Sequence, residues 1–278
     1  MKNSFAFLLV AILVVFSSCK KVYDYVEQHP AQAAKLCRIE AVKIDLYGTN
    51  YVHKIKYNSA GNPTDILQIK DATNFNPDYH FRYDNQNRLT DYYQNYRGAT
   101  GVLLWNRYSY PDKRTIVDTE FNYVGSIDDV EPPHSSEEGF DVTTFKLDGK
   151  GRIIKATLKI MSGSEFVTTY NYDDNGNLII PNYQYDDNIN IYRTNNVWML
   201  VFRNYSVNNA MQTKHYMGFG RLITEYNSFG LPTRFKSFYD QRTTPIEGSL
   251  LGLDFYTAKV EYSCDDCELP EIDSTANY

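Results

Sequence analysis

The chain has 278 residues, of which 42% are hydrophobic and 15% aromatic, and its formal net charge is −6 at pH 7. That length is sufficient for a large buried core in one large β domain or two small ones. Because no block of Lys or Arg follows Lys20 and Lys21, the acidic chain has little with which to neutralise phosphates, and nucleic acid is excluded as a partner.

Residues 1–18 have the organisation of a bacterial signal peptide. Lys2 precedes an apolar run over residues 5–16, and two serines come before Cys19. The run is too short for a transmembrane helix, which needs about 20 residues. The Phe-Ser-Ser-Cys sequence that ends at Cys19 resembles a lipobox, so we expect cleavage before Cys19 and lipid on its sulfur. An ordinary signal peptide that ends near a cysteine is the alternative.

Lipidation of Cys19 predicts that the mature protein is held at a membrane, because several acyl chains together anchor stably. Lys at position 20, where Asp would signal inner-membrane retention, favours an outer-membrane lipoprotein of the cell envelope, in either leaflet. Removing residues 1–18 with Lys2 changes the net charge from −6 to −7. Residues 19–36 are polar apart from a few side chains, and we interpret them as the lipidated cysteine and a tether.

From Cys37 onward, apolar and polar side chains alternate with the period of a β-strand. Ile154, Ala156 and Leu158, for example, alternate with Lys155 and Thr157. The 25 tyrosines and 15 phenylalanines suit pleated, half-buried surfaces. The sequence therefore predicts one all-β domain over residues 37–267, followed by a C-terminal tail at 268–278.

A short phrase recurs five times along this domain, each time as an apolar or aromatic residue, a turn rich in Asn, Asp and Gly, and a second apolar run. The residues that end the first strand of each copy are Tyr57, Tyr83, Leu147, Tyr172 and Tyr226. Consecutive hairpins predict an antiparallel meander, folded as one large curled sheet or a barrel-like architecture. Residues 124–140 lack alternation and are predicted to form a long exposed loop.

The clearest copy reads Tyr172, Asp173, Gly176, Leu178 and resembles the YD repeats of Rhs-type proteins. Together with the lipobox, it is similar to uncharacterised surface lipoproteins of Bacteroidota with degenerate YD-like hairpins, including a domain family of unknown function described as porin-like in fold. The resemblance spans residues 37–265, although Asn87 and Leu147 depart from the glycine and the tyrosine of the motif. It implies a curled or barrel-like sheet and binding at a surface.

Three cysteines remain besides Cys19, and they are Cys37, Cys264 and Cys267. The spacing of Cys264 and Cys267 matches thiol oxidoreductases, but a strand leads into it, whereas those enzymes use a helix N-terminus to lower a thiol pKa. Three cysteines also fall short of the four ligands of a zinc site. A disulfide from Cys37 to Cys264 or Cys267 would join the first strand to the last. A local Cys264–Cys267 bond and free thiols are the alternatives.

No motif for catalysis, a metal or a cofactor is found. Acidic clusters at 128–129, 173–175 and 186–188 offer oxygen ligands for calcium but lack EF-hand spacing. The five histidines are scattered, and neither a Gly-x-Ser-x-Gly elbow nor a phosphate-binding loop occurs. We expect a protein that is not an enzyme and needs no cofactor. The paired carboxylates of a glycoside hydrolase can lie far apart in sequence and are left open.

Aromatic residues are dense between 92 and 110, and exposed ones could form a platform for sugar rings. The candidates are Tyr92, Tyr93, Tyr96, Trp105, Tyr108 and Tyr110. Packing within the sheet is the favoured interpretation for any single tyrosine. Residues 197–202 are apolar without alternation, and they predict a strand covered on both faces or placed at a partner contact.

Three functional hypotheses follow. The first is a lipid-anchored binding module for a glycan or a peptide. The second is a structural or assembly subunit that meets another envelope protein through a sheet edge or through residues 197–202. The third and least favoured is a glycoside hydrolase with two carboxylates in one pocket.

Overall fold

A computed structural model of the chain describes residues 37–46, 49–70, 77–95, 102–121, 140–181, 183–214, 219–239 and 257–264. This part consists almost entirely of β-strands, as predicted. The predicted signal peptide, the tether, the tail and nearly all of the 124–140 loop lie outside the described residues. Within the described ranges, no helix is both long enough and apolar enough to span a membrane.

Fourteen strands form one antiparallel sheet in the order β10-β9-β8-β7-β6-β5-β4-β3-β2-β1-β16-β15-β14-β13. Their bounds are β1 Cys37–Leu46, β2 Thr49–Tyr57, β3 Pro63–Lys70, β4 Asp78–Tyr83, β5 Leu89–Asn95, β6 Val102–Asp112, β7 Thr115–Phe121, β8 Phe140–Leu147, β9 Ile153–Lys159, β10 Glu165–Thr169, β13 Gln212–Lys214, β14 Phe219–Tyr226, β15 Pro232–Tyr239 and β16 Thr257–Cys264. The first ten strands follow chain order, which confirms the predicted meander.

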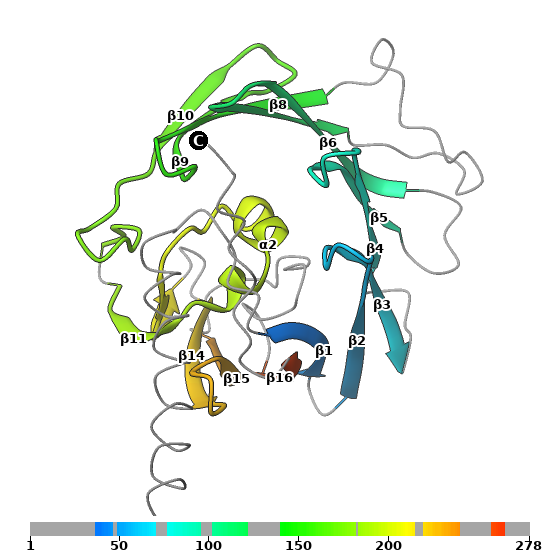
Figure 1. Cartoon of the computed structure of the whole chain (residues 1–278), viewed down its shortest axis with the longest axis vertical. Coiled ribbons are helices and arrows are strands. Elements are labelled where there is room, and N and C mark those ends of the chain that lie inside the picture. The colour runs from blue at the N-terminus through cyan, green and yellow to red at the C-terminus, as the bar shows by residue number, and fades with distance from the viewer. Residues whose placement is uncertain are drawn as a thin grey trace, which may run out of the picture.

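The sheet curls into an open ring, as Figure 1 shows, with β1 beside β16 and the hairpins following one another around the curl. In the described part of the chain, β10 and β13 end the sheet and do not pair with each other, so the curl stays open. Its concave side holds the main core, to which β1, β4, β8 and β15 each contribute. Ile39, Phe81, Phe145 and Phe235 are examples, with at most 5% of their surface exposed.

The turns of the repeated phrase share one hydrogen-bond pattern. In the clearest copy, the amide of Gly176 donates to the carbonyl of Asp173, and the amide of Asp173 donates to the carbonyl of Asn177. The Asp173 carboxylate also accepts from the Asn177 amide at 2.8 Å. The residue three positions after the first turn residue has a positive φ in every copy: Gly61, Asn87, Gly151, Gly176 and Gly230. Glycine and asparagine adopt this conformation at the lowest cost, which explains their recurrence.

The tyrosine that precedes the turn ties one hairpin to the previous one. The Tyr172 hydroxyl donates to the carbonyl of Ile153, at the start of β9, at 2.9 Å. Arg152 covers the same ring, with its guanidinium carbon 4.1 Å from the ring centroid, and forms an ion pair with Asp148 at 2.8 Å. Equivalent hydroxyl-to-carbonyl bonds join Tyr57 to Ile39, Tyr83 to Pro63, Tyr110 to Leu89 and Tyr262 to Pro232. Much of the tyrosine content is thus structural.

Residues 183–210 leave the meander, and the helix within them lies inside the curl (Figure 1). This insert contains β11 (Tyr185–Ile189), which pairs with β12 (Asn208–Ala210), a 3-10 helix η1 (Ile191–Thr194) and a short helix α2 (Asn196–Val201). The side chains of buried asparagines form hydrogen bonds with backbone groups from different parts of the insert. The Asn209 side chain, for example, accepts from the Ile191 amide and donates to the Ile189 carbonyl.

The prediction of a strand at residues 197–202 is wrong, because these residues form α2 and the turn after it. Trp198 and Met199 are completely buried, and Trp198 meets the ring of Phe81 edge-on with centroids 5.7 Å apart. The side chain of Asn195 caps the helix by accepting from the Val197 amide at 2.9 Å. The run lacks alternation because the protein interior surrounds a short helix, and the segment is therefore not an exposed partner contact.

His53 on β2 is an unusual member of the interior. It is 4% exposed, and among the described residues neither ring nitrogen has a hydrogen-bond partner. Burial lowers the pKa of His53 to about 4, and the nearby Asp78 carboxylate opposes this only in part. The imidazole is therefore neutral at pH 7.

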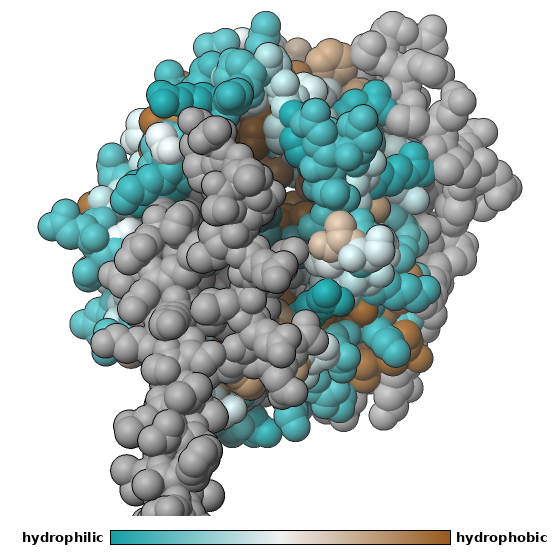
Figure 2. Space-filling view, viewed as in Figure 1, coloured by the Kyte–Doolittle hydropathy of each residue, from teal (hydrophilic) through white to brown (hydrophobic). Residues whose placement is uncertain are grey.

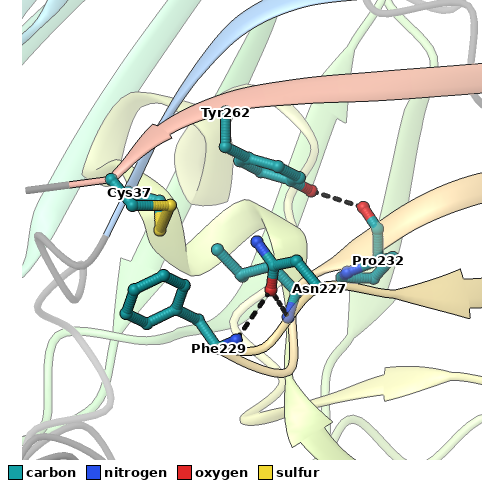
Figure 3. Close-up of a disulfide and its surroundings, with 7 residues drawn as sticks. Cys37, Asn227, Phe229, Pro232 and Tyr262 are labelled. Atoms are coloured by element: carbon teal, nitrogen blue, oxygen red, sulfur yellow. Dashed lines mark hydrogen bonds between the residues drawn. A yellow bond between two sulfur atoms is a disulfide. The ribbon is translucent and has the colours of Figure 1, made fainter.

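Cys37 and Cys264 lie opposite each other where β1 begins and β16 ends, and the structure joins them in a disulfide with 4.0 Å between their Cα atoms. Figure 3 shows the ring of Phe229 close to the disulfide and the Tyr262 hydroxyl donating to the Pro232 carbonyl at 2.6 Å. The bond connects the first strand to the last. Cys267 lies outside the described residues.

Candidate functional site

A group of polar side chains occupies the concave face of β5, β6 and β7. We call it the Asp118 cluster, and it consists of Tyr92, Asn106, Tyr108, Asp118 and Glu120. Strand pairing places these residues together, since Asn106 lies opposite both Tyr92 and Glu120 while Tyr108 lies opposite Asp118. The cluster is therefore a product of sheet register.

The inward direction of the two acids follows from alternation along β7. Ile116, which belongs to the main core, lies opposite Phe145 of the same core. Because successive side chains of a strand point to opposite faces, residues 118 and 120 share the side of Ile116. Two carboxylates are thereby directed at the interior.

Asn106 links the two carboxylates. Its amide nitrogen donates to Asp118 Oδ1 at 3.0 Å and reaches Glu120 Oε2 at 3.5 Å. The Tyr108 hydroxyl also hydrogen-bonds the Asp118 carboxyl. The carbonyl oxygen of Asn106 is buried without a hydrogen-bond partner in the described part of the chain. Buried acceptors normally receive a hydrogen bond, so this oxygen is an unusual feature of the cluster.

Burial controls the electrostatics of the cluster. Asp118 is 4% exposed, and desolvation raises the pKa of its carboxyl to about 6. The hydrogen bond from Asn106 and the positive charge of Arg203 oppose that rise, whereas the charge of Glu120 adds to it. Burial, with Asp118 as a secondary cause, also raises the pKa of Tyr108 well above its ordinary value.

The solvent-facing part of the cluster is formed by half-buried side chains. Glu120 and Tyr92 are half-buried, and Arg203, which follows α2, approaches Asp118 Oδ2 to 3.9 Å with 41% of its side chain exposed. Arg203 also lies over the ring of Phe145, 4.9 Å from its centroid. Figure 2 shows a hollow in the upper part of the curl with apolar side chains at its bottom. The side chains of this group that keep some exposure are thus an acid, a phenol and a guanidinium.

The predicted aromatic platform does not exist as one surface, because its members face opposite sides of the sheet. Tyr92 and Tyr108 belong to the concave cluster, where Tyr92 stacks on Phe81 with centroids 5.6 Å apart. Tyr93 and Trp105 stack on each other on the other face, 4.6 Å apart, and Trp105 is 2% exposed. Tyr110 ties two hairpins, as described above, and Tyr96 lies outside the described residues.

The acidic groups considered for calcium have other roles where the structure describes them. Asp173 belongs to a hairpin turn. Both oxygens of Asp186 accept hydrogen bonds: Oδ1 from the amides of Asn188 and Asn209, and Oδ2 from the Tyr226 hydroxyl. In the described residues, no group of three or more His, Cys, Asp or Glu side chains is placed to hold a metal ion. Residues 128–129 lie outside the described ranges.

Comparisons with known proteins give the following. No family model and no curated protein matches the chain. Solved structures similar to it include a porin-like protein from Bacteroides vulgatus, with 13% identity, a TM-score of 0.39, and coverage of 81% of this chain and 98% of that chain. Another is a porin-like protein from Bacteroides uniformis, with 10% identity, a TM-score of 0.34, and coverage of 82% and 96%. Likenesses at these TM-scores support no conclusion about function.

Proposed function

We propose that this chain is a lipid-anchored protein of the bacterial cell envelope that binds a glycan at the Asp118 cluster, without cleaving it. The observation that supports the site is the half-buried Glu120 beside Asn106, whose carbonyl oxygen has no partner among the described residues. Cys19 carries the anchoring half of the proposal, which rests on the lipobox resemblance and lies outside the described residues.

The exposed chemistry of the cluster suits sugar hydroxyls. A hydroxyl group both donates and accepts, so it can donate to Glu120 and accept from Arg203. Tyr92 would contact the C–H face of a sugar ring, since aromatic rings supply apolar contact area with a polar end. Arg203 already lies near the negative charge of Asp118, which makes a cationic ligand the weaker match.

A hydrolase is the second candidate, because two carboxylates do lie together. Retaining glycosidases place their carboxyl groups about 5–5.5 Å apart on either side of the scissile bond. Here the two carboxylates share the amide nitrogen of Asn106, at 3.0 and 3.5 Å, so that Asn106 occupies the space between them. The Asp118 side chain is also only 5% exposed. The arrangement favours binding over cleavage.

The test is a titration of the mature protein with a panel of neutral oligosaccharides, in which calorimetry and NMR measure binding. We expect Glu120→Ala to weaken binding at least about tenfold, which corresponds to about 1.4 kcal/mol. Glu225→Ala is the matched control, because Glu225 is an exposed strand acid 56% accessible at its side chain and paired with Arg234. Equal binding by both variants, or binding of cationic peptides in place of glycans, contradicts the assignment.

Two further measurements separate the other parts of the proposal. Cys19→Ala is expected to leave the domain folded and release it from the membrane fraction, whereas a variant that stays in the membrane contradicts the anchor. Incubation of the protein with each bound glycan, followed by an assay for new reducing ends, is expected to show none. Release of reducing ends that disappears in Glu120→Gln would support the hydrolase instead.

A further inference from the structure

The edge strand β10 is exposed in every residue. It pairs with β9 on one side, and in the described part of the chain no strand pairs with its other side. Figure 1 shows β10 at the end of the curled sheet, next to β9. An unpaired edge presents a row of backbone donors and acceptors that another strand can use.

The side chains of β10 do not protect this edge. Phe166 and Val167 are 55% and 57% exposed, and Met161 in the preceding turn is 72% exposed. Proteins commonly protect an edge with lysine, proline or a bulge. The sequence Glu-Phe-Val-Thr-Thr contains neither residue, and its pairing with β9 runs without a register shift. The strand is therefore suited to pairing.

We propose that β10 pairs antiparallel with β10 of a second copy of this chain, about a two-fold axis at Val167. Val167 then lies opposite the second copy's Val167, Phe166 opposite Thr168, and Glu165 opposite Thr169. An isologous contact of this type closes by itself and does not propagate into filaments. The two curled sheets become continuous across the seam.

Charge complementarity is the reason for choosing a second copy as the occupant. Within one chain, Lys159 lies opposite Glu165 and Lys155 opposite Thr169. Across the proposed seam, Glu165 lies opposite the second copy's Thr169, and Lys155 of that copy lies one strand further on the same face. Two strand spacings, about 10 Å, separate Glu165 from this lysine, and the two long side chains can meet above the short Thr169. Lys155 also lies opposite Lys146 on β8, a like-charge pair that destabilises a sheet. An acid from a second copy offsets that repulsion.

The other face of the seam is apolar. Phe166 and Thr168 lie opposite Leu158 and Ala156, and Ala156 belongs to the main core. The two Phe166 rings of the pair would be diagonal neighbours, about 7–8 Å apart at their backbones, which aromatic side chains can bridge. Dimerisation thus covers the most exposed apolar side chain of the strand on this face.

The contact is small, and a five-residue seam alone makes a weak dimer in dilute solution. Confinement of both copies to one membrane would raise their effective concentration. That confinement rests on the proposed lipid anchor, so the experiment is carried out on the full chain in intact cells. Glycan binding plays no part in it, which keeps failure of the dimer separate from failure of the binding site.

The test is cross-linking by a cysteine at the two-fold axis. Val167→Cys is introduced in a Cys267→Ser background, so that the remaining engineered thiol faces its own copy across the seam. Directly opposite Cβ atoms in an antiparallel pair lie about 4.5–5.5 Å apart, close to disulfide geometry. Ile179→Cys, at a residue 60% exposed outside the strands, is the matched control.

We expect Val167→Cys to give a species of twice the chain mass on a non-reducing gel and Ile179→Cys to give much less. Adding Glu165→Lys is expected to reduce that species, and adding Lys155→Glu to Glu165→Lys is expected to restore it. The proposal is overturned if Val167→Cys gives no dimer when both cysteine variants are equally abundant, or if the cross-linked product has another mass. It is also overturned if the amount of dimer does not respond to the charge reversals.

Discussion

Asp118 on β7 lies directly opposite Tyr108 on β6, and the Tyr108 hydroxyl hydrogen-bonds the buried carboxyl. Burial raises the pKa of that carboxyl from its ordinary 3.8 to about 6. A group with a raised pKa in the folded state stabilises the fold below its unfolded pKa and loses that contribution as pH rises through its folded pKa. Ionised Asp118 therefore costs stability above pH 6.

Asp118→Asn should therefore stabilise the protein above pH 6, since the amide resembles the protonated acid and carries no buried charge. The difference from the wild type is at most about 3 kcal/mol at pH 8, from 1.36 kcal/mol for each pKa unit, and it should vanish near pH 4. Urea unfolding at both pH values measures it. A variant that is less stable than the wild type at pH 8 contradicts the effect of burial.

His53 should give a pH dependence of the opposite sign. Its pKa is lowered from 6.5 to about 4 by burial, so the neutral ring is stable above pH 6.5 and stability falls as pH drops from 6.5 toward 4. The loss is at most about 3 kcal/mol. His53→Leu should remove it. In the wild type, protonation of Asp118 adds stability over the same pH range and offsets part of this loss. Asp118→Asn should therefore lose stability more steeply than the wild type as the pH falls. Equal pH dependence of stability in the wild type, His53→Leu and Asp118→Asn contradicts both assignments.

Gly176 and Gly149 form a matched pair for testing the turns. Gly176 has φ +82°, and an added Cβ would lie 3.0 Å from Val207 Cγ2, whereas an added Cβ at Gly149 meets nothing within 4 Å. We expect Gly176→Ala to destabilise by about 1–3 kcal/mol, because a left-handed conformation strains any residue with a Cβ. Gly149→Ala should be neutral or slightly stabilising. Thermal unfolding of both variants checks this, and equal melting temperatures would be inconsistent with it.

The disulfide between Cys37 and Cys264 should be a large contributor to stability, because its two cysteines are 227 residues apart along the chain. The chain-entropy model gives about 5 kcal/mol for a loop of this length, as an upper value. Cys37→Ala/Cys264→Ala should lower the free energy of unfolding by up to that amount. Treatment with reductant should affect the wild type and leave this variant unchanged. If reductant does not change the stability of the wild type, and if the wild type is no more stable than the double variant, the disulfide is not formed as assigned.

The hairpins were predictable from the sequence because their turns are local. Asp173 and Gly176 are three residues apart, and the hydrogen bonds that join them involve no distant part of the chain. The alternation of β9 was also visible in the sequence, and the structure bears it out between Lys155 and Lys159, which are exposed, and Ala156, which is buried. These features required knowledge of only a few neighbouring residues.

The insert and the site were not predictable in the same way. An apolar run of six residues fits a buried strand as well as a buried helix, and α2 was missed. Asn195, which caps it, was the available signal. Asn106, Asp118 and Glu120 meet only through the register of β6 with β7, which the sequence does not specify. The acids in phase with Ile116 were the one sign that β7 directs charge inward.

The position of the disulfide has a mechanical consequence. Tension applied through the residues before Cys37 enters the domain at the first residue of β1, the end from which a strand would peel. Because Cys37 is covalently joined to Cys264, that load passes at once into β16 as well as β1. The two strands must be pulled together, along their length, before the ladder between them can open. A domain attached at this end would resist traction from its attachment point without needing a stronger sheet.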